Sequence, residues 1–230
     1  MGKPLEKQKV DRMSRRTNIS DIRRDELTAA ALRCIAVKGY DRITLDDVAK
    51  ESGFSQGIVL YYFKNREALL ASTAQKIRND MLKFSSEIWG LPTEITNKKK
   101  ITEIIKKRFA DPHIDLISFI NEGIKIFIKW FEENSDLIAV GLEFFCQVRR
   151  NTVIAEVRDE VQPIIHDASA AFIDQGIKRG IFKKRDPDYA ANILLSLITG
   201  IAFAYATINE AGFDSKKMEK ELSNLIFGYL

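Results

Sequence analysis

Two short helical segments joined by a three-residue turn, Gly53-Phe54-Ser55, limit the fold of this chain more than any other feature of the sequence. Thr44 begins the first segment in a capping-box pattern with Asp47, in which each residue can satisfy a backbone N–H of the other. Gly53 can end that segment with a left-handed backbone, and Ser55 can cap the next segment. Two capped helices joined by a short turn that contains glycine predict a helix-turn-helix.

The rest of the chain is predicted to be helical as well. Its 230 residues are 45% apolar and include only 12 glycines and 5 prolines, which leave few turns for a sheet of many strands. We expect four helices that begin at the capping residues Ser20, Thr44, Ser55 and Asn65, then six over residues 98–109, 114–133, 135–150, 152–179, 187–209 and 215–229. The expected fold class is therefore all-α.

The net positive charge of the chain lies at its N-terminal end. Residues 1–70 carry 14 Lys and Arg against 10 Asp and Glu, whereas residues 71–230 carry 22 of each kind. A basic N-terminal module on a neutral body suits a polyanion such as nucleic acid, although a solvated basic arm would have the same charge. We expect a flexible basic arm over 1–19, a helix-turn-helix domain over 20–64 and a larger helical domain over 65–230, with the helix from Asn65 to Ile88 connecting the two domains.

The second helix of a helix-turn-helix places its N-terminal residues against base edges in the major groove. Gln56 is the candidate for reading a base, because its amide can pair with N6 and N7 of adenine, and Ile58 can contact a thymine methyl group. Gly57 weakens the helix and would let DNA approach the backbone. Candidate phosphate contacts are Thr44, Tyr61, Tyr62, Lys64 and Arg66, and Ser55 completes the predicted DNA-binding set. The alternative is that Ile58, Leu60 and Tyr61 are ordinary packing residues.

These residues resemble the N-terminal domain of TetR-family transcriptional regulators. The resemblance is carried by Gly39-Tyr40, Thr44, Asp47-Val48-Ala49, Gly53-Phe54-Ser55-Gln56-Gly57 and Tyr62-Phe63-Lys64-Asn65-Arg66-Glu67-Ala68-Leu69-Leu70. It implies a homodimer that binds a palindromic operator through its first three helices and releases it when a small molecule binds in the larger domain. By position, the resemblance places the family's DNA contacts at Thr44, Gln56, Gly57, Ile58, Tyr61, Tyr62 and Arg66. Leu60 departs from the pattern, because members often have a phosphate-contacting tyrosine there.

The last third of the chain is similar to the region through which many members of this family dimerise. The similarity lies in Gly176-Ile177-Lys178-Arg179-Gly180-Ile181-Phe182 followed by Asp186-Pro187, and it makes 152–179 and 187–209 the expected dimer helices. Residues 189–209 carry no charge over 21 residues, which is long enough to span a bilayer. Because Asn192, Ser196 and Thr199 interrupt this segment, we favour a buried packing helix over a membrane span.

Aromatic residues concentrate in the middle of the chain and suit an apolar ligand pocket. The candidate lining residues are Phe84, Trp89, Phe109, Phe127, Trp130, Phe131, Glu143 and Phe144. Glu143 lies in an apolar run and could balance a cationic ligand if it is buried, whereas an exposed carboxylate on a helix face is the simpler interpretation. Aromatic residues at helical spacing are more often part of a core than of a ligand site.

No pattern typical of an enzyme, a cofactor site or a metal site is recognisable. His113 and His166 are the only histidines, and neither Cys34 nor Cys146 has a partner at metal-binding or disulfide-framework spacing. With no targeting segment at residues 1–16, we predict a cytoplasmic, ligand-responsive DNA-binding repressor without cofactor. It would act as a homodimer on a palindromic operator and be released by a small apolar or amphipathic molecule. The alternative is an all-α adaptor that binds protein without recognising a DNA sequence.

Overall fold

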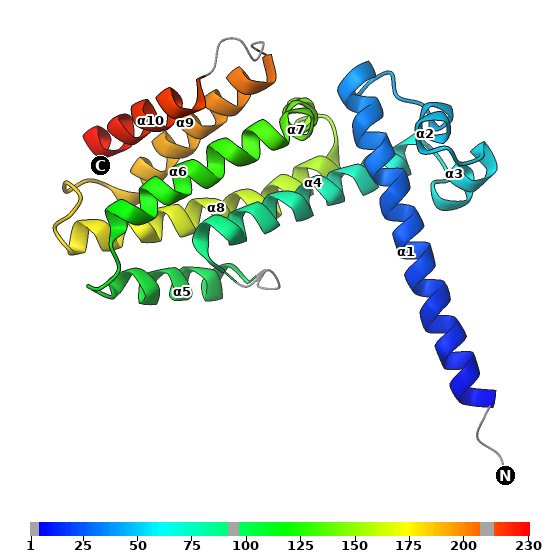
Figure 1. Cartoon of the computed structure of the whole chain (residues 1–230), viewed down its shortest axis with the longest axis horizontal. Coiled ribbons are helices and arrows are strands. Elements are labelled where there is room, and N and C mark those ends of the chain that lie inside the picture. Colours follow the sequence, from blue (N-terminus) through cyan, green and yellow to red (C-terminus); the bar gives the residue numbers. More distant parts are fainter. Residues whose placement is uncertain (1–4, 92–96, 208–213) are drawn as a thin grey trace. The chain divides into compact units, whose positions relative to one another are not determined.

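The computed structural model describes residues 5–91, 97–207 and 214–230, apart from the side chains of residues 5–18 and of Lys98. Within these ranges every regular element is an α-helix (Figure 1). The helices are α1 (Leu5–Lys38), α2 (Leu45–Ser52), α3 (Gln56–Tyr62), α4 (Arg66–Trp89), α5 (Lys98–Ala110), α6 (Leu116–Glu133), α7 (Ser135–Gln147), α8 (Thr152–Lys178), α9 (Pro187–Thr207) and α10 (Ser215–Tyr229). The all-α fold class predicted from the sequence is confirmed.

The chain folds into two compact units that meet at residues Lys76 and Ile77. Helix α4 begins in the first unit and ends in the second, so the boundary expected before Asn65 falls inside this helix. The first part of α4 belongs to the first unit because Leu69 and Leu70 are buried there.

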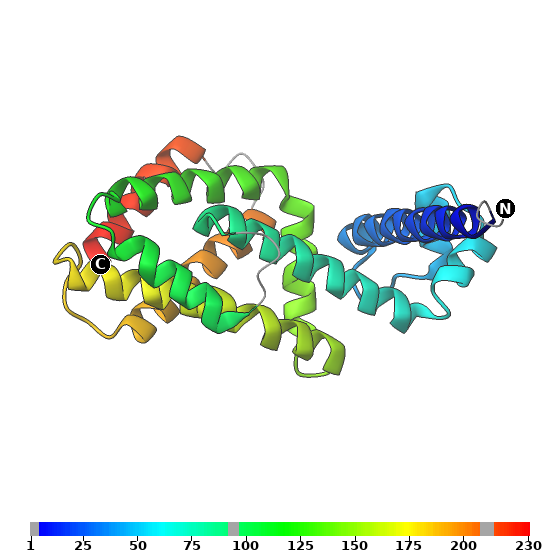
Figure 2. The same cartoon turned by 90° about the horizontal axis from the view of Figure 1, so that it is seen from below.

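The first unit is built from α1, α2, α3 and the start of α4. Helix α1 packs against α2, and α2 packs against α3 (Figure 2). The apolar stripe expected on α1 is buried, with Leu27, Ala30 and Ile35 fully inaccessible to solvent. Val48 of α2 and Val59 of α3 are also fully buried, so apolar contacts join α2 to α1 and α3 to α2.

Helix α1 differs from its predicted start. Its backbone is helical from Leu5, whereas we expected a flexible arm over residues 1–19, and Ser20 lies inside the helix instead of capping it. The sequence from Leu5 to Lys38 contains neither glycine nor proline, and its many Lys, Arg, Leu and Ala residues have high helix propensity. The helix therefore continues until Gly39, whose φ of 84° ends it in the left-handed region as predicted.

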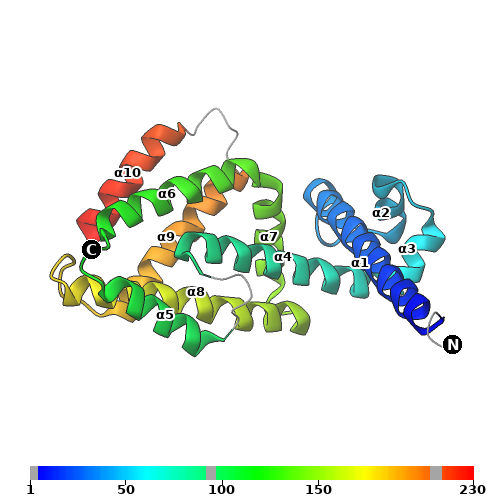
Figure 3. The same ribbon diagram turned by 60° about the horizontal axis from the view of Figure 1, so that its bottom comes forward.

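The second unit contains the remaining six helices and the second part of α4. Helix α5 lies along α8, α8 along α9, and α10 along α6, while α7 packs against α9 (Figure 3). Five of these six helices begin at the predicted residue. The sixth, α6, begins at Leu116 instead of Ile114, because the carboxylate of Asp115 accepts hydrogen bonds from the backbone N–H groups of Ile117 (2.9 Å) and Ser118 (3.2 Å).

An aromatic cluster forms the centre of the second unit. The ring of Phe109 is fully buried, and its centroid lies 4.6 Å from that of Phe119, 4.8 Å from that of Phe172 and 6.4 Å from that of Trp89. These residues come from α4, α5, α6 and α8. The cluster therefore stabilises this unit through contacts between four of its helices.

The turn after α8 is held by close packing and by an arginine. A Cβ atom at Gly176 would lie 2.0 Å from the ring of Phe182, so only glycine lets this ring rest on the helix. The guanidinium of Arg179 donates hydrogen bonds to the carbonyls of Phe109 (3.3 Å), Pro112 (3.2 Å) and Ile114 (2.8 Å). This segment is thereby joined to the loop between α5 and α6.

Helix α9 is less buried than we expected. Of the helices in the described part of the chain, it alone is long and apolar enough to cross a membrane, and 22% of its most apolar stretch is buried. Ala190 and Ala191 pack inward, whereas Tyr189 and Phe203 are 67% and 59% exposed. In the single chain α9 therefore presents an apolar face, and the prediction of a buried helix is wrong for the isolated chain.

Candidate DNA-binding site

Helix α3 is held in part by residues of its own sequence. The hydroxyl of Ser55 accepts a hydrogen bond from the backbone N–H of Ile58 (3.4 Å), which satisfies one of the free N–H groups at the start of the helix. Val59 and Phe63 are fully buried, as the sequence predicts. The remaining residues of α3 must consequently face solvent or the flanks of the unit.

The outward face of α3 carries the residues predicted to read DNA. Gln56 and Gly57 are exposed at its first turn, and the side chain of Ile58 is 39% exposed. Leu60 and Tyr61 are 46% and 80% exposed, so they are not packed into the core as the alternative interpretation requires. The ring of Tyr61 stands edge-on against that of Tyr62, with centroids 5.2 Å apart.

Thr44 lies at the exposed start of α2 in the predicted capping box. Its hydroxyl oxygen accepts from the backbone N–H of Asp47 (3.2 Å), and its own N–H donates to the Asp47 carboxylate (3.0 Å). Thr44 is exposed, so a phosphate can reach its hydroxyl. A hydrogen bond from Lys38, followed by those from Thr44, lowers the pKa of the Asp47 carboxyl.

Arg66 does not have the surroundings expected of a phosphate contact. Its Nε donates to the carbonyl of Ile43 (3.1 Å), its Nη2 donates to the carbonyl of Tyr40, and its guanidinium lies 5.4 Å from the centroid of the Tyr40 ring. Because these contacts hold the partly buried side chain on the loop before α2, we assign Arg66 a structural role in place of the phosphate contact. Lys64, by contrast, is exposed.

Two arginines of α1 that the sequence analysis counted only as charge contact the helix-turn-helix. The guanidinium of Arg23 lies 4.6 Å from the centroid of the Phe54 ring, and Nη2 of Arg24 donates to the carbonyl of Tyr62 (3.2 Å). No local pattern indicates these contacts, because the partners of each arginine lie about thirty or more residues away along the chain.

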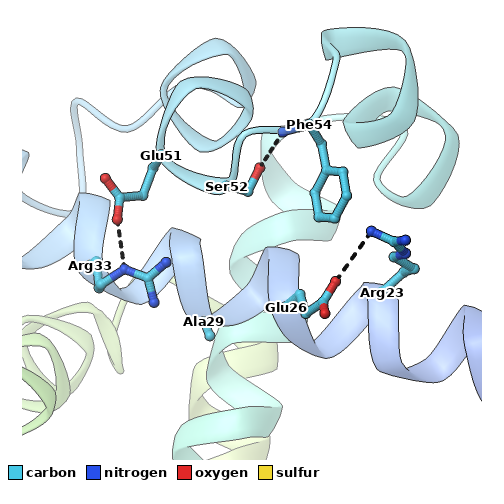
Figure 4. A pocket seen from close by; sticks show the side chains of 7 residues that line it. All are labelled: Arg23, Glu26, Ala29, Arg33, Glu51, Ser52 and Phe54. Carbon is cyan, nitrogen blue, oxygen red and sulfur yellow. Dashed lines mark hydrogen bonds and ion pairs between the residues drawn. The ribbon is translucent and has the colours of Figure 1, made fainter.

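A shallow groove of about 370 Å³ runs beside these contacts (Figure 4). It is lined by Arg23, Glu26, Ala29, Arg33, Glu51, Ser52 and Phe54. Its four charged side chains form two ion pairs, Arg23 with Glu26 (3.6 Å) and Arg33 with Glu51 (2.6 Å). The groove therefore presents little net charge, and its ion pairs link neighbouring turns of α1 and join α1 to α2.

The structure separates the predicted ligand-binding residues into two aromatic groups. Phe84 of α4 stacks on Trp130 of α6 at 4.3 Å between ring centroids, and both side chains are partly buried. Phe127 and Phe131 continue this group, with their centroids 4.0 Å apart, towards Tyr205 of α9. Tyr205 is not among the residues predicted from the sequence, because the candidate lining residues end at Phe144, well before α9.

The second group consists of Trp89 and Phe109 in the central cluster. Full burial of Phe109 favours a role in the core over a role in lining a pocket. Phe144 is 4% exposed on α7, and its neighbour Glu143 is partly buried. Phe172 and Phe182 complete the central cluster and were not among the predicted residues. No group of three or more His, Cys, Asp or Glu side chains among the described residues is arranged to hold a metal ion.

Comparison with known proteins gives a family match within the first unit and relatives that align over much of the chain. Residues 27–73 match the family model described as bacterial regulatory proteins, tetR family. A helix-turn-helix transcriptional regulator of Bacillus subtilis is 22% identical over 79% of this chain and 83% of its own length. A transcriptional repressor of Mycobacterium tuberculosis is 23% identical over 75% of this chain and 89% of its own.

Solved structures are similar over both units. A TetR transcription regulator from Haloarcula marismortui has a TM-score of 0.65 at 18% identity and covers 91% of this chain and 99% of its own. The fatty acid degradation regulator of Bacillus halodurans has a TM-score of 0.64 at 18% identity and covers 90% of this chain and 95% of its own. These likenesses establish the fold.

The capped pair α2 and α3, held on α1, defines a helix-turn-helix DNA-binding protein. The match of residues 27–73 to the tetR family model, the curated relatives and the solved structures together support a TetR-family transcriptional regulator. The resemblance recognised in the sequence is confirmed, and nothing in the comparisons supports the protein-binding adaptor.

Proposed function

We propose that this regulator is a homodimeric repressor that binds a two-fold symmetric operator through α3 and leaves it when a small apolar or amphipathic molecule binds in the second unit. The observation that carries the proposal is the orientation of α3. Its capped first turn presents Gln56 and Gly57 to solvent, while Val59 and Phe63 anchor the opposite face in the core.

On this proposal the exposed residues, together with the partly buried Tyr62, divide into base-reading and phosphate-binding groups. Gln56 pairs with a base edge, Ile58 contacts a thymine methyl group, and Gly57 allows close approach of the backbone. The groups that hold the protein in register on the phosphates are the hydroxyls of Thr44, Ser55, Tyr61 and Tyr62 and the ammonium group of Lys64. These contacts to phosphates position the unit without selecting a sequence.

The exposed apolar face of α9 supports a dimer. Tyr189, Ile193 and Phe203 are between 40% and 67% exposed, although apolar side chains of this size are normally covered when they gather on one helix. Ser196 and Gly200 are also exposed, and small residues four apart let a second helix approach closely. Helices α8 and α9 of two copies would form the interface, and two-fold symmetry would place the recognition helices about 34 Å apart.

The second unit is the proposed site of the effector. The partly buried stack of Phe84 on Trp130, together with Phe127 and Phe131, offers an apolar environment. Trp89, Phe109, Glu143 and Phe144 lie in the same unit and complete the predicted set. Because similar proteins are named as regulators of fatty acid metabolism, fatty acids are the first probes to test.

Helix α4 runs from one unit into the other and so provides the physical connection between effector and DNA. An effector that changes the protein from almost fully bound to almost fully released must favour the released state by about 5.5 kcal/mol. Cys34 and Cys146 are free cysteines, which fits a reducing cytoplasm. A DNA partner fits the same location.

Selection from a random double-stranded DNA library at near-physiological salt tests the proposal. We expect enrichment of a two-fold symmetric motif, and sedimentation at micromolar concentration should give a dimer. Enrichment of an asymmetric motif, or sedimentation as a monomer, would contradict the dimer. Absence of any enrichment would contradict sequence-specific binding by the chain alone. Loss of operator binding on adding a fatty acid, measured by fluorescence anisotropy, tests the effector.

A further inference from the structure

Helix α3 is too short to hold its own shape. It spans seven residues, from Gln56 to Tyr62, and an isolated helix of this length is unstable in water. Its N-cap and the buried Val59 fix only part of it, so the direction in which Gln56 points depends on what holds the two ends of the helix. The structure shows a contact from α1 at each end.

At the C-terminal end the contact comes from Arg24. Its Nη2 donates to the carbonyl of Tyr62, the last residue of α3, at 3.2 Å, and its guanidinium lies 5.1 Å from the centroid of the Phe63 ring. The last carbonyls of a helix have no partner within the helix and carry the negative end of its dipole. A cationic donor at this position therefore stabilises the end of α3 and ties it to α1.

At the N-terminal end the contact comes from Arg23. Its guanidinium lies 4.6 Å from the centroid of the Phe54 ring, and Phe54 directly precedes the N-cap residue Ser55 (Figure 4). A guanidinium on an aromatic face is attracted by the negative charge density of the ring. Two consecutive residues of α1 thus contact the residues at opposite ends of α3.

We propose that Arg23 and Arg24 are positioning residues that hold the two ends of α3 and thereby set where Gln56 meets a base. Both lie upstream of Leu27, where the match to the family model begins. The inference rests on the proposed reading of bases by α3. It does not assign either arginine a contact with DNA.

Positioning and phosphate binding have different signatures. An arginine bound to a phosphate adds about 0.9 to the slope of log affinity against log salt, and its loss weakens binding to every sequence. An arginine that positions α3 leaves the salt slope unchanged and mainly affects the ratio of operator binding to random-DNA binding. The two roles are therefore separated by measuring both affinities at several salt concentrations.

The test compares Arg24→Met with Arg33→Met in the full-length dimer. Arg33 lies on the same helix and pairs with Glu51 of α2, so its loss removes the same charge from α1 without touching α3 (Figure 4). We expect Arg24→Met to bind the selected operator about tenfold more weakly than Arg33→Met does. The affinities of the two variants for random DNA should agree within about twofold, and their salt slopes should be equal. Arg23→Met should lose about threefold, because a cation over an exposed ring contributes less.

Amide hydrogen exchange supplies a second measurement that does not depend on DNA. Protection of the α3 backbone should fall in Arg24→Met and stay at the native level in Arg33→Met. If Arg24→Met fails to fold, Arg24→Lys serves in its place, since it keeps the positive charge and N–H donors but loses the planar guanidinium. We then expect a smaller loss of α3 protection and a smaller loss of operator preference.

Three results would overturn the inference. These are an unchanged operator preference in the arginine variant, equal loss on operator and random DNA with a lower salt slope, and α3 protection unaffected by the substitution. If the native dimer itself selects no motif, the proposed function fails instead, so the two failures are distinguishable.

Discussion

The contacts that stabilise the first unit of this regulator differ in kind from those that stabilise the second. In the first unit, polar groups cap the short helices and hold the loop before α2, as in the capping box of Thr44 and the bonds from Arg66 to two backbone carbonyls. In the second unit, long helices are joined by aromatic rings, with Phe109 at the centre. The polar contacts of the first unit fix the ends of its short helices, whereas the ring contacts of the second unit join α4, α5, α6 and α8.

The largest effect is expected in the aromatic centre of the second unit. Phe109→Ala removes a fully buried ring and leaves a cavity, which should lower the free energy of unfolding by about 3–5 kcal/mol. Urea unfolding followed by circular dichroism measures it. Phe145→Ala, at a side chain that is 49% exposed, is the control and should stay within about 1 kcal/mol of the native value. Similar losses in both variants would show that the cluster is not the centre of the unit.

The next effect is expected at Arg66 in the first unit. Arg66→Met leaves the carbonyls of Tyr40 and Ile43 without their donor and should destabilise the first unit by about 2–3 kcal/mol. Its salt slope for DNA binding should equal that of the native protein. Lys64→Met, at an exposed neighbour, should instead leave stability unchanged and reduce the slope by about 0.9. The reverse pattern would return Arg66 to the phosphate-binding set.

A smaller effect is expected from the cap of α2. Thr44→Val keeps the shape of the side chain but removes the acceptor for the Asp47 N–H, which should lower the free energy of unfolding by about 1 kcal/mol. Thr152→Val at the exposed first residue of α8, where Asn151 is the cap, should change it by less than about 0.5 kcal/mol. A loss no greater than that of the control would remove the capping box as a stabilising element.

The smallest effect is a pH dependence at Asp47. Its pKa is lowered in the folded state by Lys38 and then by Thr44, so the unfolded state binds more protons as the pH falls. The stabilisation is present above the ordinary carboxyl pKa of about 4 and is lost as the pH drops through the lower folded value. The urea midpoint of native protein should therefore fall more steeply between about pH 5 and 2.5 than that of Asp47→Asn. If the urea midpoints of the native protein and of Asp47→Asn fell in parallel with pH, the Asp47 carboxyl would not contribute to the pH dependence of stability.

The sequence predicted the contacts of the first unit that depend on close neighbours. Thr44 with Asp47, Ser55 with Ile58 and Gly53 at the helix end lie within a few residues of each other, and the structure has all three. Arg66 was placed on phosphate because nothing near it in the sequence shows that its partners are the carbonyls of Tyr40 and Ile43. The contacts of Arg23 and Arg24 with Phe54 and Tyr62 were not predicted either, because these partners also lie far away in the sequence.

In the second unit the sequence predicted helix positions better than the roles of side chains. Helical spacing and caps located the helices, yet the same spacing marks a core and a pocket lining alike. Phe84 and Phe109 were therefore predicted together, although the structure buries Phe109 fully and leaves Phe84 partly accessible against Trp130. Tyr205 could be added only from the structure, because its contact with Phe131 joins α9 to α6.

The central claim is that the exposed first turn of α3 reads DNA bases, and Gln56→Ala tests it most directly. Binding of native and variant protein to the selected operator and to random DNA should be measured at the same salt concentration. We predict that the variant loses about 1–3 kcal/mol on the operator, with little change on random DNA, and relaxes selection at one base pair in each half-site. Equal losses on both DNAs, or an unchanged motif, would contradict the claim.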